Sequence, residues 1–584
     1  MTLVINGIGV TDGIALGQIH RLGRGELALP EFHLREDAVD DEVERASRAF
    51  DRSDRFLSKL LARLPEESGD TAVEVLEAHR LIMRDPLLKE ATLASIRQDR
   101  INAEWALAQQ SDLLQDQFNR IGDHYLARRS EDLDQVVDLI QRQLAEQPAT
   151  LLTAQVPHQM DRTILVASEI SAADMAQLHG RRVAGLITEH GGPWSHSAIM
   201  ARSLEIPMIV GAHRALAMLV EGELAIIDGH YGAVLLDFDD GLKTHYEEKR
   251  VASLRHRADL SRYLDRPART VDGERFELYG NAELPVEVRR CRESHADGIG
   301  LMRTEHLFMG PEAPDEESQY RTYRAAVEIM EGLPVTIRTL DAGGDKLPPT
   351  LADLRGANPA LGLRGLRLSL SIRELFRHQI RAILRASHHG PVRILLPMLS
   401  SVDEVREVRG LIAACREELR AEGVALDPQI QLGGMIEVPA AALTVRALAR
   451  ELDFLSIGTN DLIQYVLAVD RQDELVSHLY DPTHPALLTL IDAIVSCGQE
   501  FDQPVTLCGE LAGDPRYTRL LLGLGVTRFS MPAGHLGAVK KVLLSSHAAR
   551  CREIVADYRV GNLAGKLTGA DALIEMLERE GGAA

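Results

Sequence analysis

The chain has 584 residues, of which 45% are hydrophobic and 26% are charged, and its formal net charge is −22. A chain of this length exceeds a single hydrophobic core and predicts about two to four domains of ordinary globular composition. The negative charge argues against nucleic acid as a partner, because nucleic-acid binding requires a basic surface.

The sequence contains no apolar run long enough to span a membrane, and no basic stretch precedes an apolar one at the N-terminus. We therefore expect neither direct membrane insertion nor a secretory signal. The cysteines are scattered and odd in number, at Cys291, Cys415, Cys497, Cys508 and Cys551. They match neither a disulfide framework nor a zinc spacing, which predicts a cytoplasmic location. All of them except Cys508 are expected to be buried apolar filler.

Residues 1–28 alternate apolar and polar side chains with glycines, which predicts one or two strands. Residues 29–148 are rich in Ala, Leu, Glu, Arg and Gln, and apolar residues recur there at three- and four-residue steps. This zone predicts about four helices in antiparallel hairpins. Its expected breaks are at Pro65, Asp85–Pro86 and Gly122.

Short apolar runs return in residues 149–238, for example at 163–168 and 183–188. We expect these strands to pair with residues 1–28, so that the helical zone is an insertion in a small α/β domain. Residues 239–268 are charged and helical in pattern, with Gly241 as their only glycine, and they predict a stiff helical linker.

Residues 269–578 contain eight short β-type runs separated by helical stretches. That pattern predicts a TIM (β/α)8 barrel, and an open doubly wound sheet is the alternative. The runs are Phe276–Asn281, Gly298–Arg303, Val335–Asp341, Val392–Met398, Ile430–Glu437, Phe454–Asn460, Val505–Cys508 and Thr527–Met531.

The segment Gly191–Gly211, GGPWSHSAIMARSLEIPMIVG, follows a predicted strand and places His196 where a short helix begins. The free N–H groups and the dipole at a helix start favour anions, and imidazole is nucleophilic near neutral pH. His196 is therefore a candidate to carry a phosphoryl group. A histidine in this position is more often a cap or a surface residue, and the segment alone does not separate the two readings.

Reactive side chains gather at the carboxyl ends of the eight runs, where barrel enzymes hold their active sites. Arg303, Arg338, Arg364 and Arg471 lie at run ends or in loops, and their guanidinium groups match the geometry of phosphate and carboxylate. Each alone is more often a surface ion pair. Several at one barrel mouth would form an anion site.

Two carboxylates, Glu437 and Asp461, stand at the ends of two further runs and suit Mg²⁺ beside a phosphate-bearing substrate. Asp461 taken alone could equally cap a helix. Asp345 and Lys346 are weaker candidates for the same mouth. Cys508 ends a run beside a glycine, where a thiol can deliver a proton to a carbanion.

Together these segments resemble the enzyme I family, the phosphoenolpyruvate–protein phosphotransferases of bacterial phosphotransferase systems. The resemblance runs nearly end to end. It implies a swivelling phosphohistidine domain (1–28 and 149–238), an inserted helical subdomain that binds a carrier protein (29–148), a helical linker (239–268) and a phosphoenolpyruvate-binding barrel that also dimerises (269–578). The matching segments are SHSAIMARSLEIPMIVG, GLMRTEHLFM, IRTLDAGGDK, NPALGLRGLR, GGMIEVPAA, SIGTNDLIQYVLAVDR and LCGELAGD.

The resemblance implies a first step of sugar phosphotransfer in which His196 takes the phosphoryl group of phosphoenolpyruvate through Nε2. His196 would then pass it to the phosphocarrier protein HPr, with release of pyruvate, in a protein that is a homodimer. Because one imidazole must meet both the barrel and the carrier, we expect a hinge motion near the linker and Gly241.

The resemblance also implies roles for the barrel residues. Arg303 and Arg338 would hold the phosphate, and Asn460, Asp461 and Arg471 would contact the substrate. Glu437 and Asp461 would bind Mg²⁺, Cys508 would protonate the enolate, and Arg364 would be a further arginine of the site.

The pair Pro193–Trp194 departs from the family, which generally has a small residue or threonine before the Ser-His pair. A bulky indole there could restrict the swing of the acceptor or contact the carrier. One alternative is a dikinase-like phosphoenolpyruvate synthase, which should carry an ATP-grasp domain, whereas the zone before His196 is helical without a glycine-rich nucleotide loop. The other is a catalytically silent regulatory phosphoprotein, although every expected reactive residue is present.

Overall fold

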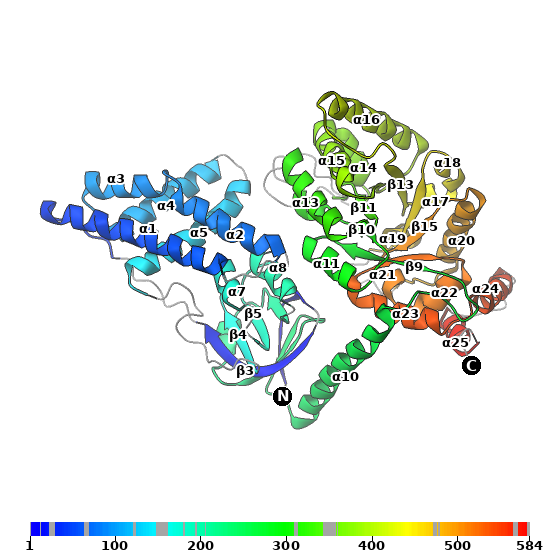
Figure 1. The fold of residues 1–584 in the computed structure, drawn as a ribbon. Helices are drawn as coiled ribbons and strands as arrows, with labels where there is room; N and C mark the ends of the chain where they lie inside the picture. The colour runs from blue at the N-terminus through cyan, green and yellow to red at the C-terminus, as the bar shows by residue number, and fades with distance from the viewer. Residues whose placement is uncertain are drawn as a thin grey trace. The chain divides into compact units, whose positions relative to one another are not determined.

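The computed structural model describes residues 2–11, 13–22, 30–62, 69–120, 124–147, 162–178, 182–192, 195–204, 206–308, 314–342, 358, 360–470, 476, 479–563 and 570–580. The chain divides into two compact units, Met1–His256 and Arg257–Ala584 (Figure 1). Each unit has a hydrophobic core of its own.

The first unit is built on a mixed sheet in the order β1-β8-β7-β3-β4-β5-β6-β2. β3 pairs in parallel with β4 and antiparallel with β7, so the N-terminal strands join strands from the far side of the helical zone, as expected. Successive side chains of a strand face opposite sides: Ile164 and Val166 belong to one core cluster, and Leu165 and Ala167 to another. The strands are β1 (Leu3–Asn6), β2 (Ile8–Gly9), β3 (Ile14–Leu22), β4 (Thr163–Ala167), β5 (Gly185–Thr188), β6 (Met208–Val210), β7 (Leu224–Asp228) and β8 (Ala233–Leu236).

Between β3 and β4 the described residues form five long helices, which pack as a bundle (Figure 1). Helix α1 buries Ala46, Phe50 and Leu57, which are spaced by four and seven residues and therefore share one face of an amphipathic helix. The sequence predicted about four helices, and this number is wrong: Arg100 ends α3 with a left-handed φ of 52°, without glycine or proline to signal the break. The helices are η1 (Glu36–Ala38), α1 (Val39–Leu61), α2 (Gly69–Arg84), α3 (Lys89–Asp99), α4 (Ala103–Arg120) and α5 (His124–Leu144).

Three short helices accompany the sheet, and one long helix follows it. They are α7 (Ala172–Leu178), α8 (His196–Ser203), α9 (Ala215–Met218) and α10 (Asp240–Leu264). The charged stretch after the sheet is thus a single helix, and Gly241 lies inside its first turn. Lys249 of α10 pairs at 3.1 Å with Asp228 of β7, whose side chain is 1% exposed, and this ion pair holds the first half of α10 to the sheet.

The second unit is a closed barrel of eight parallel strands, in the order β9 to β16 around the ring. Each predicted run contributes one strand, so the alternative of an open sheet is wrong. Leu395 and Met435 face the barrel interior, where they pack with Leu301, Phe454 and Cys508. The strands are β9 (Glu277–Ala282), β10 (Ile299–Met302), β11 (Val335–Arg338), β12 (Val392–Leu396), β13 (Gln431–Ile436), β14 (Phe454–Gly458), β15 (Val505–Cys508) and β16 (Arg528–Met531).

Helices surround these strands (Figure 1). Ser401 caps α16 and forms a capping box with Glu404, and Asp315 caps α13. The helices and 3-10 turns are α11 (Pro285–Glu293), α12 (Glu305–Phe308), α13 (Glu316–Ile329), α14 (Gly365–Ser371), α15 (Arg373–Ala386), η3 (Ser387–His389), α16 (Val402–Ala421), α17 (Pro439–Leu443), α18 (Val445–Ala449), α19 (Thr459–Leu467), α20 (Pro485–Glu500), α21 (Glu510–Gly513), η5 (Pro515–Tyr517), α22 (Thr518–Gly523), η6 (Ala533–His535), α23 (Leu536–Leu544), α24 (Ala548–Leu563) and α25 (Ala570–Glu580).

All five cysteines are buried and none of them forms a disulfide, which confirms the expectation for the four assigned as filler. Among the described residues, no helix combines the length and the apolar character that a membrane crossing requires.

Candidate active site

Four of the side chains predicted from separate strand ends and loops, Arg338, Arg364, Glu437 and Asp461, lie in one network at the mouth of the barrel. Asp341, just beyond β11, is its centre: Arg338 Nη1 lies 2.9 Å from Asp341 Oδ2, and Arg364 Nη2 lies 3.1 Å from Asp341 Oδ1. Arg338 also donates through Nη2 to Glu305 Oε1 at 2.6 Å. Arg338 and Asp341 are each only 8% exposed, so these charges interact with little screening by water.

Three carboxylates of this mouth meet closely. Asp341, Glu437 and Asp461 each offer an oxygen within 4.8 Å of the others. Burial, and then the charges of Asp341 and Asp461, raise the pKa of Glu437 well above its usual value. Arg364 Nη1 reaches Asp461 Oδ1 at 3.4 Å, so the arginine and carboxylate groups form one site.

Helix capping by Asp461, which the sequence left open, is wrong. The N-cap of α19 is Gly458, because the helix begins directly where β14 ends, and Asp461 is the third helical residue. Its carboxylate faces Arg364. Tyr465, one turn further along α19, accepts a hydrogen bond from Arg364 Nη1 at 3.2 Å and donates to the carbonyl of Ala360.

Unusual backbone conformations position two members of this network. Gly365 follows Arg364 with φ +57°, and a Cβ there would lie 2.7 Å from Cγ of Met398. Met398 itself has φ 54°, which is uncommon for a residue with a side chain, and its N–H donates to Glu437 Oε1 at 2.7 Å. Strained backbone of this kind persists where the surroundings hold it, and here it presents a donor to a buried carboxylate.

Cys508 lies inside the barrel next to this network. Its side chain is 1% exposed, and Sγ lies 3.1 Å from Ser456 Oγ. Burial raises the pKa of the Cys508 thiol to about 11, so the group is protonated at neutral pH. The charges of Glu437 and Arg338 also act on that pKa. The Cys508 thiol is therefore a protonated acid that interacts electrostatically with the arginines and carboxylates of the network.

Two predicted residues stand at the edge of the network. Arg303, just beyond β10, pairs with Glu283 at 2.9 Å and is 40% exposed. Asn460 exchanges two hydrogen bonds of 3.1 Å with Glu510: its Nδ2 donates to the carboxylate, and its Oδ1 accepts from the Glu510 N–H. These contacts fix Asn460 against α21, next to the end of β15.

Sequence reasoning gave no role to Asp341, Glu305 or Tyr465. Asp341 does end one of the predicted runs, three residues after Arg338. Glu305 follows Arg303 by two residues in a matching segment. Tyr465 is four residues after Asp461, which puts both on one helix face. The sequence could therefore have indicated these three residues through their short spacing from Arg338, Arg303 and Asp461, which were already predicted site residues.

His196 is the first residue of α8, as expected. Ser195 is the N-cap, and its Oγ accepts a hydrogen bond of 3.3 Å from the N–H of Ala198. The side chain of His196 lies outside what the structure describes. So do Arg471, Pro193–Trp194, Asp345 and Lys346.

The barrel mouth fits a divalent cation of the hard type. Mg²⁺ takes oxygen ligands, and three carboxylate oxygens are close enough together to share one ion. Glu437 is nine-tenths or more buried, and a buried carboxylate without a cation is costly. In the wider network, the carboxylates of Glu305, Asp341, Glu437 and Asp461 face two guanidinium groups, and a divalent cation would balance the charge left over.

Family models for the PEP-utilising enzymes cover the chain in three segments. The model described as PEP-binding domain matches residues 257–548, the N-terminal model matches 6–129, and the mobile-domain model matches 159–232. The first of these contains every described element of the barrel mouth. The class of the protein is therefore that of an enzyme that uses phosphoenolpyruvate.

Relatives of full length narrow the class. A phosphoenolpyruvate-protein phosphotransferase of Cupriavidus necator is 41% identical over 571 residues, which covers 95% of this chain and 96% of the relative. The protein of the same name in Bacillus subtilis is 37% identical, and the match covers 91% of this chain and 92% of the relative. That of Staphylococcus carnosus is 35% identical, and the match covers 95% of this chain and 96% of the relative. A solved structure of Enzyme I (nEIt) is 26% identical over 43% of this chain and 99% of its own, with a TM-score of 0.38. The chain belongs to the phosphoenolpyruvate-protein phosphotransferase family and is a transferase.

Proposed function

We propose that this protein transfers the phosphoryl group of phosphoenolpyruvate to Nε2 of its own His196, then to a histidine of the phosphocarrier protein HPr, and releases pyruvate. The observation that carries the proposal is the convergence of Arg338, Arg364 and three carboxylates on one barrel mouth. Phosphoryl transfer depends mostly on such positioning and on electrostatic stabilisation of the charged oxygens.

In this proposal, Arg338 and Arg303 hold the phosphate of the substrate. Arg338 Nε is buried and has no hydrogen-bond partner among the described residues, so it is a donor available to an anion. Arg303 is more exposed and exchanges its contact with Glu283 for one with the substrate. Asn460, Asp461 and Arg471 are proposed to contact the substrate, and Arg364 orients Asp461.

Glu437 and Asp461 are proposed to hold Mg²⁺, together with Asp341. The ion would neutralise charge on the substrate oxygens as the phosphoryl group leaves. The ion pairs of Asp341 with both arginines keep that carboxylate oriented toward the other two.

The phosphorus–oxygen bond to the enol oxygen breaks, a bond from phosphorus to Nε2 of His196 forms, and the electron pair stays on the enol oxygen. The methylene carbon of the enolate then takes a proton from the Cys508 thiol and becomes the methyl group of pyruvate. The thiolate that remains regains its proton from solvent.

Because His196 and the barrel mouth belong to different units, we propose that the units move during each cycle, as loading and unloading of one imidazole require. From the family resemblance we further propose that the barrel forms a homodimer and that the cascade serves sugar uptake in the cytoplasm. Solution scattering tests the motion, and identical profiles with and without phosphoenolpyruvate and Mg²⁺ would count against it.

Incubation with ³²P-labelled phosphoenolpyruvate and Mg²⁺, followed by mapping of the acid-labile label, tests the transfer itself. We expect incorporation at His196, its loss in His196→Ala and its retention in His190→Ala, a matched exposed histidine of the preceding loop. Label at another residue, or unchanged labelling of His196→Ala, would refute the proposal. ATP-dependent labelling of His196 would instead favour a dikinase-like enzyme, and failure to form either labelled protein or pyruvate from phosphoenolpyruvate would favour a silent phosphoprotein.

A further inference from the structure

Two cavities lie in the helical shell of the barrel, away from the mouth, with volumes of about 400 Å³ and about 330 Å³. The smaller of the two is the candidate binding site. It is bounded by α16 and by the residues that lead into β13 and β14, namely Ile430 and Asp453. It therefore lies at the amino ends of these strands, whereas Glu437 and Asp461 follow their carboxyl ends.

The cavity joins an apolar floor to a cationic rim. Ile394, Ile412 and Leu432 form the floor, and all three are buried. Arg409, Arg416 and Arg420 form the rim from one face of α16, where steps of seven and four residues bring side chains into line. Five of the ten lining residues are charged, so the cavity is suited to a ligand with both an apolar and a charged part. Its volume of about 330 Å³ is at the lower end for small-molecule sites.

Arg416 is the central and least satisfied cation of this rim. Its Nη2 donates only to the carbonyl of Ile430, at 3.4 Å, and its Nε is buried without a partner among the described residues. Burial, and then the neighbouring charge of Arg420, lower its pKa. In the described part of the chain, each other arginine with a shifted pKa is shifted upward and has a carboxylate partner.

The acidic groups of the cavity are already engaged. Glu417 accepts from Arg420 Nη1 at 2.6 Å. Asp453 accepts from the N–H of Leu432 at 2.7 Å and lies 3.9 Å from Arg409. Neither carboxylate forms an ion pair with Arg416, so the guanidinium group of Arg416 is open to an external anion.

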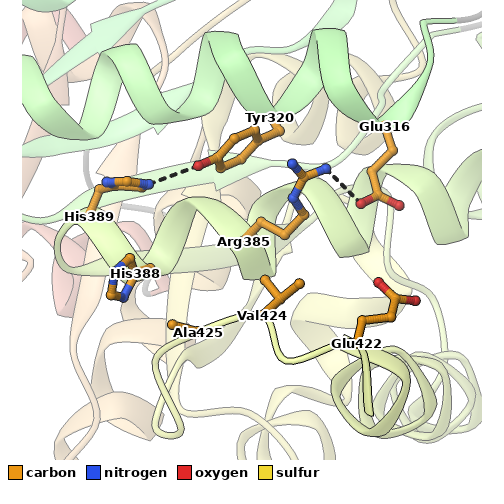
Figure 2. Close-up of a pocket in the computed structure, with 8 residues that line it drawn as sticks. All are labelled: Glu316, Tyr320, Arg385, His388, His389, Glu422, Val424 and Ala425. Carbon is orange, nitrogen blue, oxygen red and sulfur yellow. Dashed lines mark hydrogen bonds and ion pairs between the residues drawn. The ribbon is translucent and has the colours of Figure 1, made fainter. Parts of the chain in front are cut away.

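The larger cavity shows the contrasting arrangement (Figure 2). There Arg385 pairs with Glu316 at 2.8 Å and Glu317 at 2.7 Å, and its guanidinium stacks 4.0 Å from the centroid of the Tyr320 ring. Tyr320 also contacts His389 at 2.9 Å. In the larger cavity, two carboxylates of the protein balance the charge of Arg385. In the smaller cavity, Arg416 has no such ion pair among the described residues.

We propose that the cavity under α16 binds a small organic anion, with its phosphate or carboxylate group on Arg416 and its apolar body on the floor formed by Ile394, Ile412 and Leu432. Arg409 and Arg420 flank the charged group. The site is separate from the barrel mouth, so the proposal does not depend on the transfer reaction proposed above.

Equilibrium dialysis with phenyl phosphate, which joins a phosphate to a small apolar ring, tests this site. The barrel mouth also binds anions, so the comparison is between variants. Arg416→Gln should remove one equivalent of bound phenyl phosphate per chain, or raise the dissociation constant of that equivalent at least about tenfold, since hydrogen bonds to charged groups are involved. Arg406→Gln, an exposed arginine of the same helix that pairs with Glu451, should bind as the unaltered protein does.

Two further measurements separate binding from a structural role. Without ligand, Arg416→Gln should have a melting temperature no lower than the unaltered protein, because it removes a half-buried, unbalanced charge. Ala413→Glu, at an exposed lining position of α16, should abolish the same equivalent by placing a carboxylate at the rim. Turnover of phosphoenolpyruvate should be unchanged in all three variants. Equal phenyl phosphate binding by Arg416→Gln and the unaltered protein would overturn the proposal.

Discussion

Replacement of Cys508 by alanine separates proton delivery from substrate binding. The thiol is 1% exposed and packs in the barrel interior with Leu395 and Met435. Loss of one buried sulfur is comparable to loss of one methylene, so the free energy of unfolding should fall by about 1 kcal/mol. That is a small part of the stability of a domain, and the barrel should remain folded.

The chemical effect should be much larger. With a pKa of about 11, Cys508 is almost wholly protonated at pH 8 and is ready to act as an acid. General acids contribute about 10²–10⁴-fold to rate. Pyruvate formation in Cys508→Ala should therefore fall at least about 100-fold. Binding of phosphoenolpyruvate should change little, because the ion pairs of Arg338 and Arg364 do not involve the thiol.

The rate of pyruvate formation is measured in a single turnover. The affinity for phosphoenolpyruvate is measured by calorimetry in the presence of Mg²⁺. Ser456→Ala is the matched control, since it removes the 3.1 Å neighbour of the thiol and keeps the thiol itself. In the unaltered protein, the protonation step should be independent of pH between about 6 and 9. Near-normal pyruvate formation by Cys508→Ala would refute the assignment of Cys508 as the proton donor. A pKa near 8 that disappears in this variant would instead show that burial does not raise the thiol pKa to about 11.

Three other predictions follow from the same geometry. Asp341→Asn removes the shared partner of two buried arginines, and it should lower the free energy of unfolding by about 3 kcal/mol in urea denaturation and weaken Mg²⁺ binding at least about tenfold. Gly365→Ala places a Cβ at φ +57° against Met398 and should cost about 1–3 kcal/mol, whereas Gly410→Ala, in open space within α16, should add up to about 1 kcal/mol. The folded state keeps the Cys508 proton to a higher pH than the unfolded state does, so stability is complete below pH about 8 and falls as pH rises toward 11. Between pH 8 and 10, the free energy of unfolding should therefore fall by about 1 kcal/mol less in Cys508→Ala than in the unaltered protein.

Each of these has a clear contrary result. Unchanged Mg²⁺ affinity in Asp341→Asn would remove Asp341 from the metal site. Equal stability changes at Gly365 and Gly410 would show that the left-handed backbone beside Arg364 imposes no constraint. Parallel pH–stability curves for Cys508→Ala and the unaltered protein would mean that the thiol ionises alike in the folded and unfolded states.

Local patterns in the sequence were sufficient for the elements themselves. The eight β-type runs each overlap one strand of the barrel, because buried parallel strands are short continuous apolar runs and the helices between them have a different period. His196 was placed at a helix start from the predicted strand and the two glycines before it, and the structure adds Ser195 as the N-cap of that helix. The break at Arg100 was missed because a left-handed arginine leaves no mark in composition.

The site was only partly predictable for a different reason. Barrel topology says that strand ends share one mouth, so Arg338, Glu437 and Asp461 could be grouped from the sequence. Which of them touch depends on side-chain packing: Arg364 meets Asp461 across 97 residues, and Met398 meets Glu437 across 39. No local pattern encodes such distances.

The sequence by itself therefore determined the periodicity, the order of the elements and the end of the barrel at which charge collects. Only the tertiary structure decided that Asp341 bridges two arginines, that Asp461 faces Arg364 instead of capping its helix, and that Arg416 forms no ion pair with any residue in the described part of the chain. The physical reason is that hydrophobic periodicity acts between near neighbours, whereas the pairing of buried charges is settled by closure of the barrel, which brings distant strand ends within a few ångströms.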